Sequence, residues 1–345
     1  ARPEIQNPTD AVVKVTLACV CGSDLWDYID SEVLEVGRPR GHEFLGVVES
    51  VGSEVSTLQV GDLVVAPFVS SCGHCDFCLQ GLQTSCRELA FFGHGGEAGG
   101  QSEAVRVPNA EGTLVKLPVS IDSPLLPSLL TLSDVMCTGH HAAVTGKVKK
   151  GETVVVIGDG AVGLCAVIAA KRLGAGRIIL MGRHQDRTDL GREFGATDVV
   201  SERDADGISK VLELTGGDGA HSVLECVGTQ VSIEMALSVV RAGGTVGRVG
   251  AAQYEQIPFG FGPLMRNITI TGGVAPVHCR NPKRTFPPLH SVIPDETREA
   301  ANAIGIGGHY LALLPVIDKA TRTKSGFWGM RCGGELDPIL FVAWG

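Results

Sequence analysis

Four cysteines within one short segment, SCGHCDFCLQGLQTSC, carry the clearest chemical pattern in this sequence. Their spacing is C-x2-C-x2-C-x7-C. Four thiolates satisfy the tetrahedral coordination of a closed zinc site, and such a site orders a loop that has few apolar side chains. The alternative is a set of buried or disulfide-bonded cysteines, but cysteines this close together rarely serve packing alone. We therefore predict a structural zinc held by Cys72, Cys75, Cys78 and Cys86.

A second pattern, G-x-G-x-x-G, occurs at Gly158, Gly160 and Gly163, after an apolar run at 153–157. The first glycine allows a tight turn, the second lets the backbone approach a pyrophosphate, and the third lets helix and strand pack closely. The alternative is an ordinary glycine-rich turn, in a chain that contains 46 glycines. Because the motif stands between a strand and a helix, we predict dinucleotide binding.

The elements that must position this motif alternate between strand and helix. The first helix carries apolar residues over 161–170, Gly174 ends it, and a strand follows at 178–181. Further helices are expected near 186–194, 208–214 and 231–241, and further strands at 197–200, 222–226, 245–249 and 267–271. This alternation predicts a doubly wound α/β domain with a parallel sheet.

The first third of the chain is rich in predicted strands. Residues 11–20 form one strand, 41–55 read as strands joined by a turn at Gly52-Ser53, and 60–68 form another. Short strands and turn glycines continue to about residue 118, with the spacing of a barrel. Residues 129–144 have helical character and lead into the dinucleotide-binding unit.

Length and composition narrow the function classes. The 345 residues suit two domains, and 44% hydrophobic with 19% charged residues describe a soluble globular protein. A net charge of −9 argues against nucleic acid or an anionic membrane as the main partner. The polar start and the short apolar runs predict a cytoplasmic protein. Eleven cysteines, an odd number of which four cluster, favour metal binding in a reducing compartment.

Cys21 and His42 are weaker candidates for metal ligands. Each lies beside a glycine at the end of a predicted strand. A single histidine is more often a packed core or surface residue than a ligand. Spacing alone does not bring Cys21, His42 and Asp134 together, so their assignment depends on a resemblance.

Five segments carry that resemblance: CGSDLW, GHEFLGVVESVG, the four-cysteine loop, LSDVMCTGHHA and VVVIGDGAVGL. Together they resemble the zinc-dependent alcohol dehydrogenases of the medium-chain dehydrogenase/reductase superfamily, over residues 11–276. The family implies a GroES-like β-barrel catalytic domain, here 1–133, a Rossmann domain, here 134–277, and a homo-oligomer, either dimer or tetramer. Residues 278–345 do not align with the family and form an atypical C-terminal segment in which only 296–314 offers a helix. The family's opening β-hairpin is also missing before Ala1.

The resemblance implies a catalytic zinc site. Cys21 and His42 match two of the zinc ligands, and Asp134 occupies the position of the third. Glu43 matches a neighbouring carboxylate that can approach the metal. A cysteine, a histidine and a carboxylate leave one coordination position open for a substrate oxygen or water. Ser23 matches the hydroxyl that hydrogen-bonds the alcohol.

Two residues near these positions, Cys137 and Trp26, are not predicted to bind zinc. Cys137 lies three positions after Asp134, and we do not predict it as a ligand. Trp26 stands where many family members have a histidine that passes a proton outward, so the relay would use cofactor hydroxyls or water. Trp26 is expected either to line the substrate pocket or simply to pack.

The implied reaction is hydride transfer between a small alcohol or carbonyl substrate and a nicotinamide. Zinc polarises the substrate oxygen, Ser23 takes the alcohol proton, and the Rossmann domain holds the nicotinamide in position. Two alternatives stay open: a zinc-dependent polyol or sugar dehydrogenase, and a catalytically silent dinucleotide-binding protein.

The choice of cofactor depends on the end of the second strand of the Rossmann unit, ILMGRHQDR. NAD-binding units place an acid there that accepts from the ribose 2′-OH, whereas Gly182 occupies that position here. Arg183 follows at once, and an arginine can bind a 2′-phosphate through paired hydrogen bonds. We therefore predict NADP over NAD. The predicted cofactor-binding residues are Gly158, Gly160, Ala161, Val162, Gly163, Gly182, Arg183, His184 and Arg187.

Overall fold

The computed structural model describes residues 2–25, 40–94, 98–276 and 340–343. These residues form two compact units, one of residues 2–134 with a C-terminal strand and the other of Val135–Ala275. The predicted domain boundaries were placed after residues 133 and 277. Trp26, the helix expected at 296–314 and nearly all of the atypical segment 278–345 lie outside the described residues.

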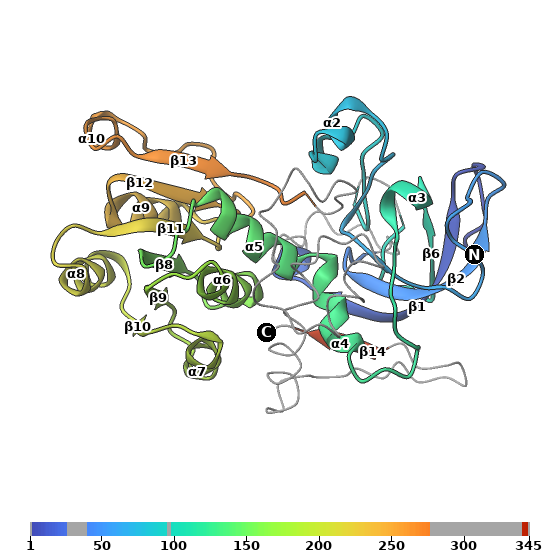
Figure 1. Cartoon of the computed structure of the whole chain (residues 1–345), viewed down its shortest axis with the longest axis horizontal. Helices are drawn as coiled ribbons and strands as arrows, with labels where there is room; N and C mark the ends of the chain where they lie inside the picture. Colours follow the sequence, from blue (N-terminus) through green and yellow to red (C-terminus); the bar gives the residue numbers. More distant parts are fainter. Residues whose placement is uncertain (1, 26–39, 95–97, 277–339, 344–345) are drawn as a thin grey trace. The chain divides into compact units, whose positions relative to one another are not determined.

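The first unit is built on a mixed sheet in the order β14-β1-β2-β3-β7, with β6 also paired to β1 (Figure 1). β1 covers the apolar and β-branched run expected at 11–20, and it pairs antiparallel with β2 and β6 and parallel with β14. The strands are β1 (Ala11–Val20), β2 (Phe44–Val51), β3 (Leu63–Ala66), β6 (Ala104–Val107), β7 (Val115–Lys116) and β14 (Leu340–Ala343).

The expectation of two strands within 41–55 was wrong. This segment contains the single strand β2, whose hairpin partner is β3. After β2 the chain turns at Gly52, whose N–H donates to the carbonyl oxygen of Asp10. A Cβ on Gly52 would lie 2.2 Å from the carbonyl oxygen of Pro8, so this glycine serves close backbone packing.

Short elements connect and follow these strands along the chain, and the last of them in sequence ends at Ser133, before the second unit begins. They are η1 (Gly22–Leu25), β4 (Val69–Ser70), α2 (Asp76–Leu79), η3 (Gln83–Ser85), β5 (Ala90–Phe91), α3 (Ala110–Thr113), α4 (Leu126–Leu130) and η4 (Thr131–Ser133). β4 and β5 pair as a separate two-stranded sheet that brackets the cysteine loop.

The second unit contains a parallel sheet of six strands in the order β10-β9-β8-β11-β12-β13. Numbered along the chain, this is the order 3-2-1-4-5-6 of a dinucleotide-binding fold. The strands are β8 (Thr153–Ile157), β9 (Arg177–Met181), β10 (Asp198–Val200), β11 (Ala220–Glu225), β12 (Val240–Arg248) and β13 (Thr269–Gly272). The predicted α/β fold class, with a GroES-like unit and a Rossmann unit, is confirmed.

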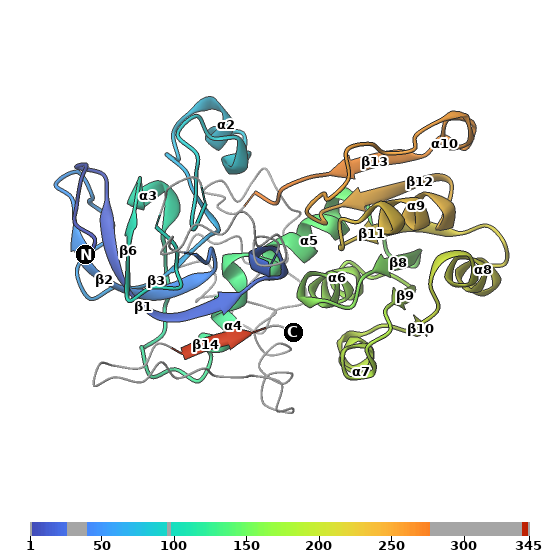
Figure 2. The same cartoon turned by 180° about the vertical axis from the view of Figure 1, so that it is seen from behind.

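Helices cover both faces of this sheet, with α5, α6 and α7 on one face and α8 and α9 on the other (Figures 1 and 2). They are α5 (Val135–Thr145), α6 (Ala161–Arg172), α7 (Gln185–Phe194), α8 (Asp204–Leu214), α9 (Gln230–Val239) and α10 (Phe261–Met265). The helix expected at 231–241 ends at Val239, because Val240 already pairs with β11 as the start of β12. Among the described residues, no helix has both the length and the apolar character needed to span a membrane.

Candidate functional site

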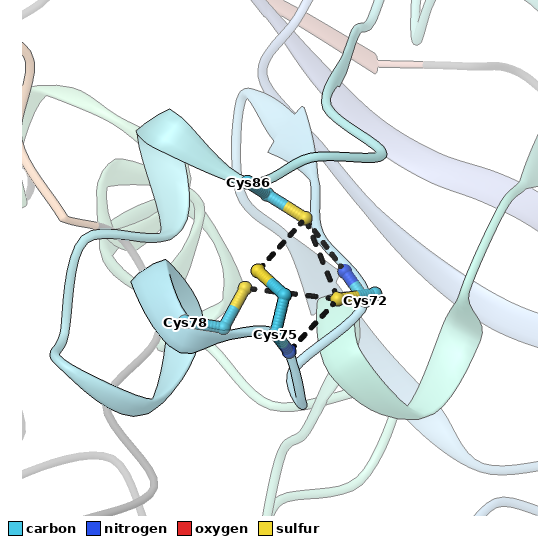
Figure 3. A group of neighbouring side chains, drawn as sticks. All are labelled: Cys72, Cys75, Cys78 and Cys86. Carbon is cyan, nitrogen blue, oxygen red and sulfur yellow. Dashed lines mark hydrogen bonds between the residues drawn. The ribbon is translucent and has the colours of Figure 1, made fainter.

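The four cysteines of the predicted structural zinc site converge in the first unit (Figure 3). Their sulfur atoms all lie within 4.8 Å of one another. Cys86 Sγ is 3.5 Å from Cys72 Sγ, and the Cys72–Cys78 and Cys75–Cys86 sulfur pairs are each 4.0 Å apart. A tetrahedron with Zn–S bonds of about 2.3 Å has sulfur atoms about 3.8 Å apart, whereas a disulfide needs about 2.05 Å. The geometry therefore fits a metal and does not fit disulfides.

Backbone N–H groups donate to two of these sulfur atoms. The Cys72 N–H donates to Cys86 Sγ at 3.2 Å, and the Cys75 N–H donates to Cys72 Sγ at 3.3 Å. Hydrogen bonds from the backbone of Arg87 and Cys78 lower the pKa of the Cys75 thiol to about 6. A thiolate is the form that binds zinc, so the loop favours the ligating state of this cysteine.

A second group of possible ligands lies at the end of the main sheet of the first unit. One ligand atom from each of Cys21, His42, Glu43 and Asp134 lies within 4.8 Å of the others. The register explains why residues that are distant in sequence meet here. β1 and β2 are antiparallel with Ala18 opposite Phe44, so the end of β1 meets the start of β2.

Asp134 reaches this group from the end of η4. The Phe68 N–H, after β3, donates to the carbonyl oxygen of Ser133 at 3.2 Å and so ties η4 to the sheet. Ser23 lies half-buried in η1, two residues after Cys21. Cys137 is buried in α5 and is not part of this group.

His42 is held between two carboxylates. Its Nδ1 lies 3.2 Å from Asp24 Oδ1, and its Nε2 lies 3.4 Å from Asp134 Oδ2. Burial lowers the pKa of His42, but Asp134, Asp24 and the sulfur of Cys21 outweigh burial and raise it well above its ordinary value. A carboxylate on one imidazole nitrogen fixes the ring for ligation through the other.

Glu43 shows that this group fits a cation. Its side chain is 1% exposed, and within the described part of the chain no nitrogen or hydroxyl group donates a hydrogen bond to either carboxylate oxygen. Burial and the charge of Asp134 raise its pKa to about 8. A buried carboxylate without donors is unfavourable unless a positive charge compensates it. With a cysteine sulfur and an imidazole beside it, the donor set suits zinc.

The second unit contains a pocket of about 320 Å³ at the carboxyl ends of its strands. β8 and β11 are neighbours in the sheet, and the strand order reverses between them. Ligands of doubly wound sheets bind at this switch point. The lining includes residues 157–160, 181–182, 187, 201–203, 226–227 and 229.

The three glycines of the motif form a backbone cradle at this pocket. Gly158 has a φ of +112°, and a Cβ on Gly163 would lie 1.9 Å from the carbonyl oxygen of Gly158. Gly160 faces open space, with nothing within 4 Å of its Cβ position. The first helical bond runs from Leu164 N–H to Gly160, so the N–H groups of residues 161–163 have no partner within the helix. The cradle therefore fits a pyrophosphate at the N-terminus of α6.

The predicted cofactor-binding residues after β9 do not all lie at the pocket. Arg187 lines the pocket, whereas Arg183 is exposed and is not among the lining residues. Gly182 is buried, and a Cβ there would lie 2.4 Å from the Cβ of Asp159. The absence of an acidic side chain at position 182 therefore has a steric cause that the sequence did not reveal.

Sequence reasoning missed several residues of these sites. Asp24 and Asp159 each contact a predicted site residue, and Ser201, Glu202 and Arg203 line the pocket after β10. The position of residues 201–203 at the end of the third strand was the available indication, because strand ends of such a sheet meet at one edge.

Comparisons with known proteins agree with this architecture. The family model of the alcohol dehydrogenase GroES-like domain matches residues 7–119, and that of the zinc-binding dehydrogenases matches residues 161–288. Zinc-type alcohol dehydrogenase B of Aspergillus flavus is 37% identical over 289 residues, which cover 81% of this chain and 67% of the relative.

Solved structures give the same result. Alcohol dehydrogenase TADH from Thermus sp. ATN1 is 35% identical, covers 80% of each chain and has a TM-score of 0.72. A zinc-binding dehydrogenase from Sinorhizobium meliloti, solved with bound NADP, is 25% identical, with 99% and 94% coverage and a TM-score of 0.67. The chain therefore belongs to the zinc-dependent alcohol dehydrogenase family of the medium-chain dehydrogenase/reductase superfamily, an oxidoreductase family that implies zinc and a nicotinamide cofactor.

Proposed function

We propose that this chain interconverts an alcohol and its aldehyde or ketone by hydride transfer to or from NADP(H). The observation that carries the proposal is the group of Cys21, His42, Glu43 and Asp134, whose ligand atoms lie within 4.8 Å of one another. Zinc bound by Cys21, His42 and Asp134 would supply a Lewis acid that lowers the pKa of an alcohol oxygen.

The chain's own side chains have separate tasks in this proposal. Asp24 holds the His42 ring, and Glu43 provides a buried carboxyl group beside the metal ligands that can approach the cation. The Ser23 hydroxyl accepts the alcohol proton and passes it to cofactor hydroxyls or water. The glycine cradle and α6 hold the pyrophosphate and so fix the position of the nicotinamide.

We also propose a second zinc at the cysteine loop, which gives two zinc ions per chain. Within the loop, Arg87 forms an ion pair with Asp76 and donates to both of its carboxylate oxygens at 3.0 Å. The Arg87 guanidinium also lies 5.1 Å from the centre of the Phe77 ring. These exposed contacts are too weak to order the loop alone, so its order would depend on the metal.

The proposed preference for NADP has two supports. Two arginines, Arg187 and Arg203, line the pocket, and the Sinorhizobium meliloti relative was solved with bound NADP. The test is the dissociation constant of each oxidised cofactor, measured by titration calorimetry. Equal or tighter binding of NAD would contradict the preference.

A homo-oligomer in the cytoplasm is a further part of the proposal. Three side chains of α10 are largely exposed: Phe261 at 74% and Leu264 and Met265 at 63% each. Apolar side chains gathered on a short edge element are typical of an interface. Size-exclusion chromatography with light scattering tests the oligomer, and a monomer would contradict it.

The function is tested by assaying the zinc-loaded full chain against a panel of alcohols and carbonyl compounds with both cofactors. The panel includes polyols and sugars, because a polyol or sugar dehydrogenase uses the same zinc ligands. Reduction of NADP by at least one alcohol supports the proposal. A chain that holds two zinc ions and binds a nicotinamide cofactor, but turns over no member of the panel, would instead be a catalytically silent family member.

A further inference from the structure

Asp159 stands between the first two glycines of the motif and fills the space beside Gly182. A Cβ on Gly182 would meet the Asp159 side chain at 2.4 Å from Cβ, 2.8 Å from Cγ and 2.8 Å from Oδ2. An acid is therefore present at this edge of the pocket, but it comes from the glycine loop rather than from the end of β9. The substitution Gly182→Asp would displace Asp159, so it changes two side chains at once.

The Asp159 carboxylate is engaged by the segment that follows β9. Its Oδ2 accepts from the His184 backbone N–H at 2.9 Å, and the His184 Nδ1 lies 3.0 Å from Oδ2 and 3.2 Å from Oδ1. The Arg187 guanidinium lies 4.0 Å from Oδ1. The carboxylate is 9% exposed and therefore faces protein donors on most sides.

The charge state of Asp159 agrees with these contacts. Burial opposes ionisation, but the hydrogen bonds from the His184 backbone and ring and the nearby charges of His184 and Arg187 outweigh burial. Together they hold the pKa of Asp159 below its ordinary value. Asp159 is thus an ionised carboxylate that faces the His184 imidazole and the Arg187 guanidinium.

We infer that Asp159 is a positioning residue for cofactor selectivity, which holds His184 and Arg187 as a basic pair for the 2′-phosphate of NADP. The inference rests on the proposed preference for NADP. Arg187 lines the pocket, whereas His184 is not among the lining residues and contacts Asp159 from outside. The ion pair of 4.0 Å with Asp159 restricts the Arg187 guanidinium on one side, so its N–H groups reach a second anion at a lower entropic cost.

The opposite role would give Asp159 the task of the acid in NAD-binding proteins. In that case the carboxylate would accept from the ribose 2′-OH and repel a 2′-phosphate. The contacts favour positioning, because the protein's own donors already occupy the carboxylate. The two roles predict opposite effects on 2′-phosphate binding when the negative charge of Asp159 is removed.

The test uses two fragments that differ only in the group of interest, adenosine 2′,5′-bisphosphate and adenosine 5′-monophosphate. Their binding to the full chain is measured by titration calorimetry, without turnover. Asp159→Asn and Arg187→Gln should each weaken the bisphosphate about tenfold, as expected for loss of a charge-assisted contact, and change the monophosphate less than twofold. The double variant should bind the bisphosphate no more weakly than the weaker single variant, because both substitutions disrupt one unit.

Asp186→Asn is the matched control. It removes one negative charge from an exposed residue of the same segment, at the start of α7, and should change neither fragment's affinity by more than twofold. Thermal melting checks that each variant folds, and Asp159→Ser replaces Asp159→Asn if that variant does not.

The binding results distinguish a failure of the proposed NADP preference from a failure of the positioning role of Asp159. A wild-type chain that binds both fragments equally contradicts the NADP preference and the role of Asp159 with it. A wild-type preference for the bisphosphate that persists or increases in Asp159→Asn overturns the positioning role alone. Additive losses in the double variant also overturn it, since independent contacts would then act at the two residues.

Discussion

Asp24 and His42 form a buried pair in which Asp24 Oδ1 lies 3.2 Å from His42 Nδ1. The other carboxylate oxygen of Asp24 accepts from the Cys21 backbone N–H at 2.9 Å. One side chain thus supports two predicted zinc ligands. We expect Asp24→Asn to lower the affinity for the catalytic zinc about 10- to 100-fold, measured by competition with a chelator. The exposed Asp122→Asn is the charge-matched control, and equal zinc affinity in both variants would show that Asp24 does not support the ligands.

Asp134 is the predicted third ligand of the catalytic zinc. Asp134→Asn should keep the fold but weaken metal binding or turnover, because a neutral amide is a poor zinc ligand. Zinc content by mass spectrometry and kcat/KM are the readouts. Cys137→Ala, at a buried site outside the ligand group, should keep both zinc ions. An Asp134→Asn chain with full activity and normal metal content would exclude Asp134 and make Cys137 the next candidate.

The cysteine loop is predicted to hold structural zinc. Cys75→Ser should remove about one zinc per chain and lower stability or solubility, while the other zinc stays bound. Gln80→Ala is the control within the same loop, because this exposed residue belongs to none of the groups of possible metal ligands found in the described part of the chain. Unchanged zinc content in Cys75→Ser would overturn the assignment.

Arg177 and Asp198 join β9 to β10 through two hydrogen bonds of 2.8 and 2.7 Å. The hydrogen bonds from Arg177 hold the pKa of Asp198 below its ordinary value, although burial opposes this. The pair therefore stabilises the fold above the unfolded pKa of Asp, and this contribution is lost as the pH falls through the lower folded pKa. Because Arg177 is 37% exposed, screening limits the loss in Asp198→Asn to about 0.5–1 kcal/mol at neutral pH.

Denaturant unfolding at several pH values measures this difference. Asp198→Asn and the wild type should converge in free energy of unfolding as the solution becomes acidic. Asp189→Asn, which breaks the exposed pair with Arg192 on α7, should cost less at neutral pH. A difference for Asp198→Asn that is independent of pH would contradict an electrostatic origin.

Much of the second unit could be predicted from the sequence because local patterns determine it. Apolar runs, helix periodicity and turn glycines indicated β8, α6 and β9 to within two residues at each end. The cysteine loop was predictable for the same reason, since its four ligands share one short segment.

The other sites depend on contacts that are distant in sequence. Cys21 and His42 meet only through the antiparallel register of β1 and β2, which spacing along the chain does not encode. Asp24 and Asp159 look like ordinary turn residues in the sequence, and their partners follow from the folded positions of His42 and His184. The interpretation of Gly182 as a missing acid likewise omitted the space that Asp159 fills.

In the proposed reaction, the chain transfers hydride from an alcohol carbon to NADP with the help of zinc at Cys21, His42 and Asp134. The most direct measurement uses an active alcohol from the panel, deuterated at the carbinol carbon, and determines the mass of the reduced cofactor. We predict one deuterium in each NADPH formed by the zinc-loaded chain, and almost no product from the chelator-treated chain until zinc is restored. Reduced cofactor without deuterium, or equal product formation without zinc, would contradict zinc-assisted hydride transfer.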